Sequence, residues 1–301
     1  PAFLISAVRC YCLGLGLAVG EAEAIAPDGA DQKSWSRSTG LCLCTADGFL
    51  CEKNYGGVMQ NFADFTENLK FVPPEKNFYI GDDVAAAIEV YKNGGKSCKY
   101  RAGTEDNGYG SVVRMIPVAI YLGEIDFLEC ELGHQEMKII HDTVRIINNH
   151  SFSIVACSIY VTIGRLLLGG FSTDQSIYEA IKLVSRYYSG SPVYRSALLE
   201  LRDLYNMDIF RLLPEAAIFG SENSVRTVEA AIWCLINSEN YEDCVRMAKK
   251  LGGASDVVCS AAGGLAGLCY GFEGIPEGWI RRLKSQREIK EVSKKMAERF
   301  K

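Results

Sequence analysis

Apolar residues recur along most of the chain at the spacing of an α-helix. Tyr241, Val245, Ala248 and Leu251, for example, follow one another at steps of three or four residues and so share one helix face. Strict alternation of apolar and polar residues, which is typical of half-buried strands, is nearly absent. The pattern predicts an all-α protein with a single domain over residues 1–301 and with its functional side chains on the loops between helices. The predicted helices cover residues 82–91, 154–168, 176–188, 197–205, 225–236, 241–251 and 257–270, and a charged C-terminal helix covers 281–301.

Two apolar stretches raise the question of a membrane. The run from Ser151 to Gly170 contains Arg165 and ends in two glycines, so we expect a buried helix there. The N-terminal stretch 1–24 has no basic start and is interrupted by Arg9, which argues against a signal peptide. We therefore expect no membrane partner. The segment 257–270 is rich in alanine and glycine, so a neighbouring helix can approach its backbone closely.

Composition and charge narrow the class of protein. With 48% hydrophobic and 23% charged residues, the chain can bury a large core, which excludes a disordered protein. The net charge of -5, without an extended basic run, argues against a nucleic-acid partner. The 12 cysteines form no C-x-x-C motif, and the pairs Cys10/Cys12 and Cys42/Cys44 point to different faces of a helix. We expect reduced, mostly buried cysteines in a cytoplasmic protein.

Four segments have the composition of functional loops at helix ends. Residues 34–40 gather hydroxyls around one arginine, and residues 103–111 place glycines ahead of a helix, where free backbone N–H groups suit a phosphate. Residues 147–150 bring His150 in front of a long apolar helix, and residues 251–257 place Asp256 after a double-glycine turn. Taken singly, each segment is explained as well by ordinary helix capping or turn formation.

Taken in order, these segments carry the motifs of a known family. Gly16–Ala22 is similar to G-x-A-x-G-D-A, with Glu21 in place of the aspartate, and Trp35–Thr39 lies where the family has W-[ST]-D-D-[ST]. Further similar segments are Asn107–Arg114 (N-G-N-G-S-x-M-R), Asn148–His150 (the T-H-x-H region), Thr227–Trp233 (T-x-E-A-A-x-W), Leu251–Val257 (L-G-G-D-T-D-T), Gly263–Gly267 (G-G-L-A-G) and Ile275–Trp279 (I-P-E-x-W). Over nearly its whole length the chain resembles the ADP-ribosylglycohydrolases, which are orthogonal helical bundles that remove ADP-ribose from proteins or small molecules.

The chain departs from this family where the resemblance implies a pair of magnesium ions. The four acidic family positions read Arg37, Ser38, Ala254 and Asp256, so a single carboxylate is left. Magnesium prefers octahedral oxygen ligation with anionic ligands. A unit charge 4 Å from the Arg37 guanidinium interacts with it by about 4 kcal/mol at an effective dielectric of about 20, and a divalent ion is repelled about twice as strongly. We therefore predict no metal and no other cofactor, and we expect Arg37 to occupy the vacated position and pair with Asp256.

The resemblance also implies which residues form the site. Asp256 and Glu21 are the candidate catalytic acids, and we expect Asp256 to lie within reach of the loop 35–39. The candidate ligand-binding residues are Ser36, Arg37, Ser38, Gly81, Asn107, Gly108, Tyr109, Gly110, Ser111, Asn148, His150, Gly253 and Ser255. Because backbone N–H donors do not depend on side-chain type, ligand binding is expected to survive better than catalysis.

Three functions follow. The first is a catalytically impaired relative that binds ADP-ribose, a related nucleotide or a protein partner. The second is an active ADP-ribosyl hydrolase or other N-glycosidic enzyme with a metal-independent mechanism centred on Asp256, which needs a positioned water and, where protonation is required, a second acid. The third is a helical scaffold for a partner, which an exposed apolar patch over the cleft would favour.

Overall fold

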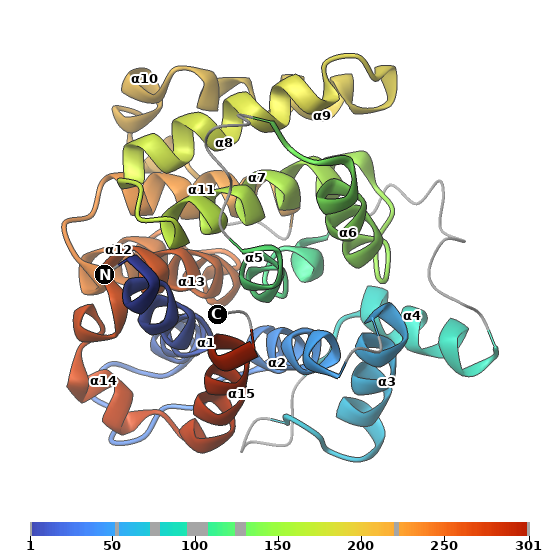
Figure 1. Cartoon of the computed structure of the whole chain (residues 1–301). Coiled ribbons are helices and arrows are strands. Elements are labelled where there is room, and N and C mark those ends of the chain that lie inside the picture. The colour runs from blue at the N-terminus through green and yellow to red at the C-terminus, as the bar shows by residue number, and fades with distance from the viewer. Residues whose placement is uncertain are drawn as a thin grey trace.

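In the computed structural model the chain forms an assembly of helices (Figure 1). The structure describes residues 2–51, 54–72, 79–94, 108–123, 131–219 and 223–299, and of residues 2–13, 54, 109 and 299 it describes the backbone alone. No strand occurs in these ranges, and the prediction of an all-α fold is confirmed. The helices are α1 (Ala2–Ile25), α2 (Arg37–Leu50), α3 (Asn54–Glu67), α4 (Asp82–Lys92), η1 (Tyr109–Ser111), α5 (Ile116–Leu122), α6 (His134–Val144), α7 (Ser151–Leu168), α8 (Thr173–Tyr188), η2 (Pro192–Tyr194), α9 (Arg195–Glu200), η3 (Arg202–Tyr205), α10 (Met207–Arg211), η4 (Glu215–Ala217), α11 (Ser224–Ile236), α12 (Tyr241–Lys250), α13 (Ser255–Gly274), α14 (Glu277–Arg282) and α15 (Gln286–Arg299).

Two of the predicted helices have the wrong extent. The stretch 197–205 is divided at Leu201 into α9 and the 3₁₀ helix η3, because Leu201 and Leu204 are both buried and a three-residue spacing aligns them on one side of a 3₁₀ turn. The stretch 281–301 is not one helix, since α14 ends at Arg282 and α15 begins only after Ser285, whose φ of 49° no helix accommodates. The other predicted helices occur within a few residues of their expected bounds.

The centre of the fold is the close packing of α1 against α13. A Cβ atom added to Gly16 would lie 2.6 Å from the carbonyl oxygen of Gly263, and one added to Gly263 would lie 2.6 Å from the oxygen of Gly16. Tyr241 of α12 donates its hydroxyl to the same Gly16 oxygen at 2.5 Å. The expectation that the small residues of 257–270 admit a neighbouring backbone is therefore confirmed.

The remaining helices lie above and below this central pair (Figure 1). Helices α7 and α11 pack on α13, and α8, α9 and α10 form an outer layer over them. On the other side lie α2, α3 and α15, with α2 in contact with both α3 and α15.

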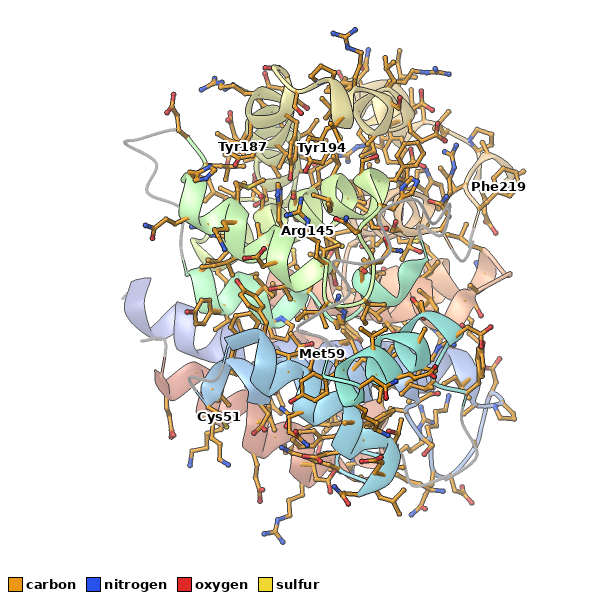
Figure 2. The ribbon with its side chains drawn as sticks, turned by 90° about the vertical axis from the view of Figure 1, so that its right-hand side faces the viewer. Cys51, Met59, Arg145, Tyr187, Tyr194 and Phe219 are labelled. Carbon is orange, nitrogen blue, oxygen red and sulfur yellow. The ribbon has the colours of Figure 1, made fainter. Side chains whose placement is uncertain are left out.

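An aromatic cluster fixes α6 against α8. The ring of His141 stacks on Tyr188 at 5.6 Å, and its Nε2 lies 2.5 Å from the Tyr188 hydroxyl, which also contacts the Ser158 hydroxyl at 2.9 Å. Burial, together with the nearby Arg145, lowers the pKa of His141 to about 4. Figure 2 shows Tyr194 of the same cluster in the outer layer, above Arg145. The cluster thus joins the last turns of α6 to the end of α8.

Two helices, α7 and α13, are long and apolar enough to cross a membrane by length and composition alone. In this fold they are core helices, with 89% and 67% of their apolar windows buried. The cysteines follow the same pattern. Among the described residues, Cys42, Cys44, Cys157, Cys234, Cys244 and Cys259 are buried, whereas Cys51 is exposed. For these six, the prediction of core cysteines is confirmed.

Candidate functional site

The N-terminus of α2 is held by a carboxylate from the core. Glu21 of α1 is 0% exposed and accepts hydrogen bonds from the backbone N–H groups of Ser38 and Thr39, both at 3.0 Å, and from the Thr39 hydroxyl at 2.6 Å. The N-cap residue Ser36 makes no side-chain cap bond, so Glu21 takes over that function. Burial raises the pKa of Glu21, and these hydrogen bonds oppose the rise. This geometry fits a residue that positions the α2 end.

Arg37 connects α2 to the start of α4. Its Nη1 donates to the backbone oxygen of Tyr79 at 3.4 Å, and its guanidinium carbon lies 5.7 Å from the centre of the Tyr79 ring. The same Nη1 lies 3.8 Å from where a Cβ of Gly81 would be. Gly81 is the N-cap of α4 and has φ of 97°, a conformation that favours glycine. The predicted ligand-binding residues Arg37 and Gly81 therefore lie together.

Asp83, in the first turn of α4, fills the space between two glycines. Its Oδ1 lies 2.8 Å from where a Cβ of Gly81 would be, and its Oδ2 lies 2.9 Å from where a Cβ of Gly110 would be. Gly110 belongs to η1, whose preceding residue Gly108 forms an isolated antiparallel bridge with Asn223. Asp83 therefore joins α4 to the η1 loop. The bridge between Gly108 and Asn223 in turn joins that loop to the start of α11.

The starts of α11 and α7 are joined by two hydroxyls. Ser224 of α11 and Ser153 of α7 lie 2.9 Å apart at their Oγ atoms. His150 is the N-cap of α7 and accepts the Phe152 N–H at its Nδ1, while its own N–H is donated to the Asn148 side chain at 2.7 Å. The side chains of Asn148 and His150 thus build the loop in front of α7.

The predicted residues Gly253, Ser255 and Asp256 lie in and just before the first turn of α13. The turn before it contains Gly253, with φ of 58°, and its N-cap position is Ala254, which has no capping side chain. Ser255 and Asp256 follow in the first turn and are half-buried. The helix contacts α1, α2 and α11. The expectation that Asp256 lies within reach of residues 35–39 stays a prediction.

These contacts bring the N-termini of α2, α4, α7 and α11 around the η1 loop. At these ends side chains already accept several of the first N–H groups: Glu21 accepts those of Ser38 and Thr39, and Asn223 accepts those of Val225 and Arg226. The four ends therefore share the partial positive charge of the helix dipole. Several such ends facing one region favour an anionic ligand such as a phosphate. The described side chains add one guanidinium, from Arg37, and the carboxylate of Asp83.

Comparison with known proteins decides the family. The model of the ADP-ribosylglycohydrolase family matches residues 10–301. The chain belongs to the ADP-ribosylglycohydrolase family. The resemblance in the motifs is thereby confirmed.

Individual family members are distant from this chain. An ADP-ribosylarginine hydrolase of Pseudomonas putida (strain GB-1) is 22% identical over 88% of this chain and 66% of its own length. An ADP-ribosyl-[dinitrogen reductase] glycohydrolase of Rhodospirillum rubrum is 26% identical over 76% of this chain and 68% of its own length. The chain thus spans about two thirds of these relatives. A solved ADP-ribosylglycohydrolase-related protein complex has the same fold, with a TM-score of 0.71 at 20% identity, over 97% of this chain and 98% of the other.

The structure corrects one expectation about the site and leaves two residues aside. No ion pair joins Asp256 to Arg37 in the part of the chain that the structure describes; the Arg37 guanidinium lies against Tyr79, so the predicted pairing is not found. Asn107 lies outside the described residues, as does the side chain of Tyr109. Asp83 was not predicted, because two acids in the first turn of a helix are already explained by the helix dipole.

The donors at the family's magnesium positions do not fit a pair of magnesium ions. Arg37, Ser38, Ala254 and Asp256 supply one carboxylate, one hydroxyl, one methyl group and one fixed positive charge. In the described parts of the chain, no three His, Cys, Asp or Glu side chains are grouped so that they could hold a metal ion. Magnesium needs several oxygen ligands with anionic charge among them.

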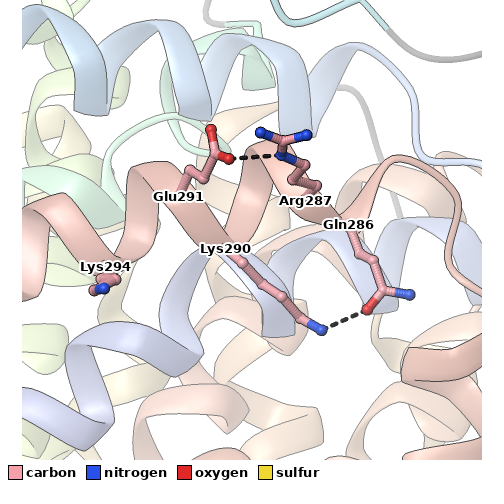
Figure 3. A pocket seen from close by; sticks show the side chains of 5 residues that line it. All are labelled: Gln286, Arg287, Lys290, Glu291 and Lys294. Carbon is pink, nitrogen blue, oxygen red and sulfur yellow. Dashed lines mark hydrogen bonds and ion pairs between the residues drawn. The ribbon is translucent and has the colours of Figure 1, made fainter.

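A separate hollow of about 310 Å³ lies along α15 (Figure 3). Its lining charges are largely paired within the helix, Arg287 with Glu291 at 2.7 Å and Lys290 with the Gln286 side chain at 2.5 Å. None of its lining residues belongs to the helix N-termini described above. The hollow is therefore not part of the candidate site.

Proposed function

We propose that this chain binds ADP-ribose or a related nucleotide without a magnesium pair, and that its hydrolase activity is impaired. The observation that carries the proposal is the meeting of four helix N-termini around the η1 loop beside Arg37. The relatives are named for removing ADP-ribose from arginine or from dinitrogen reductase, so ADP-ribose is the part their substrates share.

Backbone geometry supports binding. Gly110 and Ser111 of η1 carry main-chain N–H groups whose direction is independent of side-chain replacements. The Arg37 guanidinium adds a permanent positive charge and can donate two hydrogen bonds to one phosphate. These N–H groups and the guanidinium can therefore offset the negative charge of a diphosphate without a metal ion.

The donor chemistry supports impaired hydrolysis. A single carboxylate remains at the four metal positions, and the second candidate acid, Glu21, is buried and bonded to the α2 N-terminus. Hydrolysis of an N-glycosidic bond needs a positioned water and acid–base assistance. Asp256 by itself offers only part of this machinery.

The test is a calorimetric titration with ADP-ribose, in magnesium and in EDTA, alongside an assay for free ADP-ribose released from ADP-ribosylarginine. We expect the same affinity in both buffers and no release. Release of ADP-ribose would overturn the impairment and make Asp256 the first residue to replace. Absence of binding in both buffers would reject the nucleotide and favour a protein partner.

Two sets of variants sharpen this test. Replacing Arg37 with methionine removes the guanidinium and is expected to weaken ADP-ribose binding about tenfold, whereas Arg195→Met on the exposed face of α9 is the matched control. A second variant restores acids at the family positions and carries Arg37→Asp, Ser38→Asp and Ala254→Asp. It is expected to bind magnesium with an affinity detectable by calorimetry. If it gains no magnesium affinity, the loop geometry has diverged along with the ligands.

A further inference from the structure

We propose that the outer face of the segment 192–212 is the contact surface of a homodimer, in which a second copy of this chain packs on it across a two-fold axis. The segment comprises η2, α9, η3 and α10, which belong to the outer layer of the fold (Figure 1). None of its residues is among those predicted for the nucleotide site, so the inference does not depend on the proposed function.

The segment gathers exposed apolar side chains. In the described parts of the chain eleven large hydrophobic residues are exposed, and five of them lie in this one short segment. They are Val193, Leu199, Tyr205, Ile209 and Leu212. The most exposed is Leu212, with 81% of its surface accessible. Single exposed hydrophobic residues are common, but a cluster of them marks an interaction surface.

The buried residues of the same elements show that these side chains point outward. Ala197 of α9, Leu204 of η3 and Phe210 of α10 are buried, and beneath them α9 contacts α7, η3 contacts α8 and α10 contacts α11. Ile209 and Leu212 are three residues apart and therefore share the opposite, solvent side of α10. Because η2, α9, η3 and α10 contact one another in chain order, their exposed side chains form one continuous outer face.

The apolar area of the outer face matches what a stable dimer needs. Five large side chains that are each about half exposed or more offer on the order of 500 Å² of apolar surface, at about 100 Å² each. A standard interface buries about 800 Å² on each partner, and roughly 60% of this area, or about 500 Å², is apolar. The outer face therefore supplies the apolar share of one complete interface.

The balance of charge on the segment suits a second copy of the chain as the partner. The segment carries three arginines, three acids and no lysine, so two identical faces do not repel one another. Arginine is enriched and lysine depleted in protein interfaces. Four of the six charges have partners within the chain, in the ion pairs Arg211–Asp174, Glu200–Arg226 and Arg202–Asp203.

The two remaining charges have opposite signs and lie at opposite ends of the outer face. Arg195 belongs to α9 and Asp208 to α10, and both are exposed without an ion pair in the part of the chain that the structure describes. Figure 1 shows α9 and α10 at opposite ends of the outer layer. A two-fold axis between these ends places Arg195 of each copy opposite Asp208 of the other. The outer face is therefore complementary to itself in charge as well as in apolar character.

The experiment is sedimentation velocity on the purified chain over a concentration range of about 1 to 100 µM. We expect a reversible equilibrium between monomer and dimer, with the dimer predominant at the highest concentration. Leu212→Asp places a charge in the middle of the apolar contact and is expected to weaken dimerisation about tenfold or more. Leu69→Asp is the matched control, because it makes the same change at an exposed leucine after α3, on the other side of the molecule, and should leave dimerisation unchanged.

An exchange of charges tests the two-fold arrangement. Arg195→Glu places like charges opposite each other and is expected to weaken dimerisation about threefold to tenfold at low salt. Combining Arg195→Glu with Asp208→Arg makes the facing charges opposite again and should recover most of the wild-type affinity. This recovery is specific to two copies that meet through the same face, since a contact with any other surface does not regain its charge pair.

Each remaining outcome contradicts the inference. A wild-type chain that stays monomeric over the whole range overturns it, and so does a dimer that Leu212→Asp leaves intact, because another surface then joins the copies. If the combined charge variant does not recover dimerisation, the two-fold pairing is wrong. Thermal unfolding shows whether each variant is folded, and Ile209→Lys replaces Leu212→Asp if that variant is not.

Discussion

Glu229 of α11 gives a quantitative test of the structure, because it is an acid buried in the core. It is 4% exposed; its Oε2 pairs with Arg226 at 2.6 Å, whereas its Oε1 is buried without a hydrogen-bond partner. Burial dominates over the attraction of Arg226 and raises the pKa of Glu229 to about 7. In the unfolded chain the pKa is about 4.3. Between these two values the folded state holds the proton more tightly, so the stability that Glu229 contributes falls as pH rises from about 4 to about 7.

The size of the effect follows from the two pKa values. When Glu229 is ionised in both states, the folded state loses about 3 to 4 kcal/mol relative to the protonated acid, at about 1.4 kcal/mol for each pH unit between the two values. Most of this loss, about 2 to 3 kcal/mol, falls between pH 5 and pH 8. Glu229→Gln has no titratable group at this position, so its folded state does not lose this stability as the pH rises.

The assay is urea unfolding of wild type and Glu229→Gln at pH 5 and pH 8. Taking the difference between the two proteins at each pH removes the contribution of every other titrating group. We expect the variant to gain about 2 to 3 kcal/mol relative to wild type on going from pH 5 to pH 8. Glu200→Gln is the control, since Glu200 also pairs with Arg226, at 2.7 Å, but is 41% exposed. A difference for Glu229→Gln that is the same at both pH values would refute the argument.

Two further predictions concern packing and the buried ion pair. Gly16→Ala places a Cβ 2.6 Å from the Gly263 oxygen and is expected to lower the melting temperature, at a cost of about 1 to 3 kcal/mol; Gly56→Ala, in an open position of α3, should be neutral or stabilising by up to about 1 kcal/mol. Lys33→Met removes the ammonium that lies 2.5 Å from Glu23 and leaves that carboxylate with Arg282, 3.5 Å away. The expected cost in urea unfolding is at most about 3 to 5 kcal/mol, and a variant as stable as wild type would contradict the pairing.

Sequence patterns predicted the helices well because their signals are local. The acids at the start of 241–251 and the lysines at its end flank a continuous apolar face, and α12 begins and ends at those signals. The division of 197–205 was missed because Leu201 and Leu204 fit either an α-helix or a 3₁₀ helix, and only their burial against other helices selects the second.

Three of the residues predicted for the site lie close together in the structure, but their arrangement was not predicted. Arg37, Gly81 and Gly110 lie around Asp83, which was not among the predicted residues. The direction of the Arg37 side chain depends on Tyr79, which lies in no motif, so no pattern in the sequence could have aimed the guanidinium away from Asp256.

The bonds between Glu21 and the α2 N-terminus bear on how this lineage diverged. At Ser38 the carboxylate accepts only the backbone N–H, and Arg37 takes no part, so neither residue's side chain is needed to hold the loop. Substitutions at positions 37 and 38 can therefore accumulate without displacing the backbone on which they stand. A protein built in this way can exchange one ligand chemistry for another at positions 37 and 38 by point mutation, while the bonds between Glu21 and Thr39 keep the frame in place.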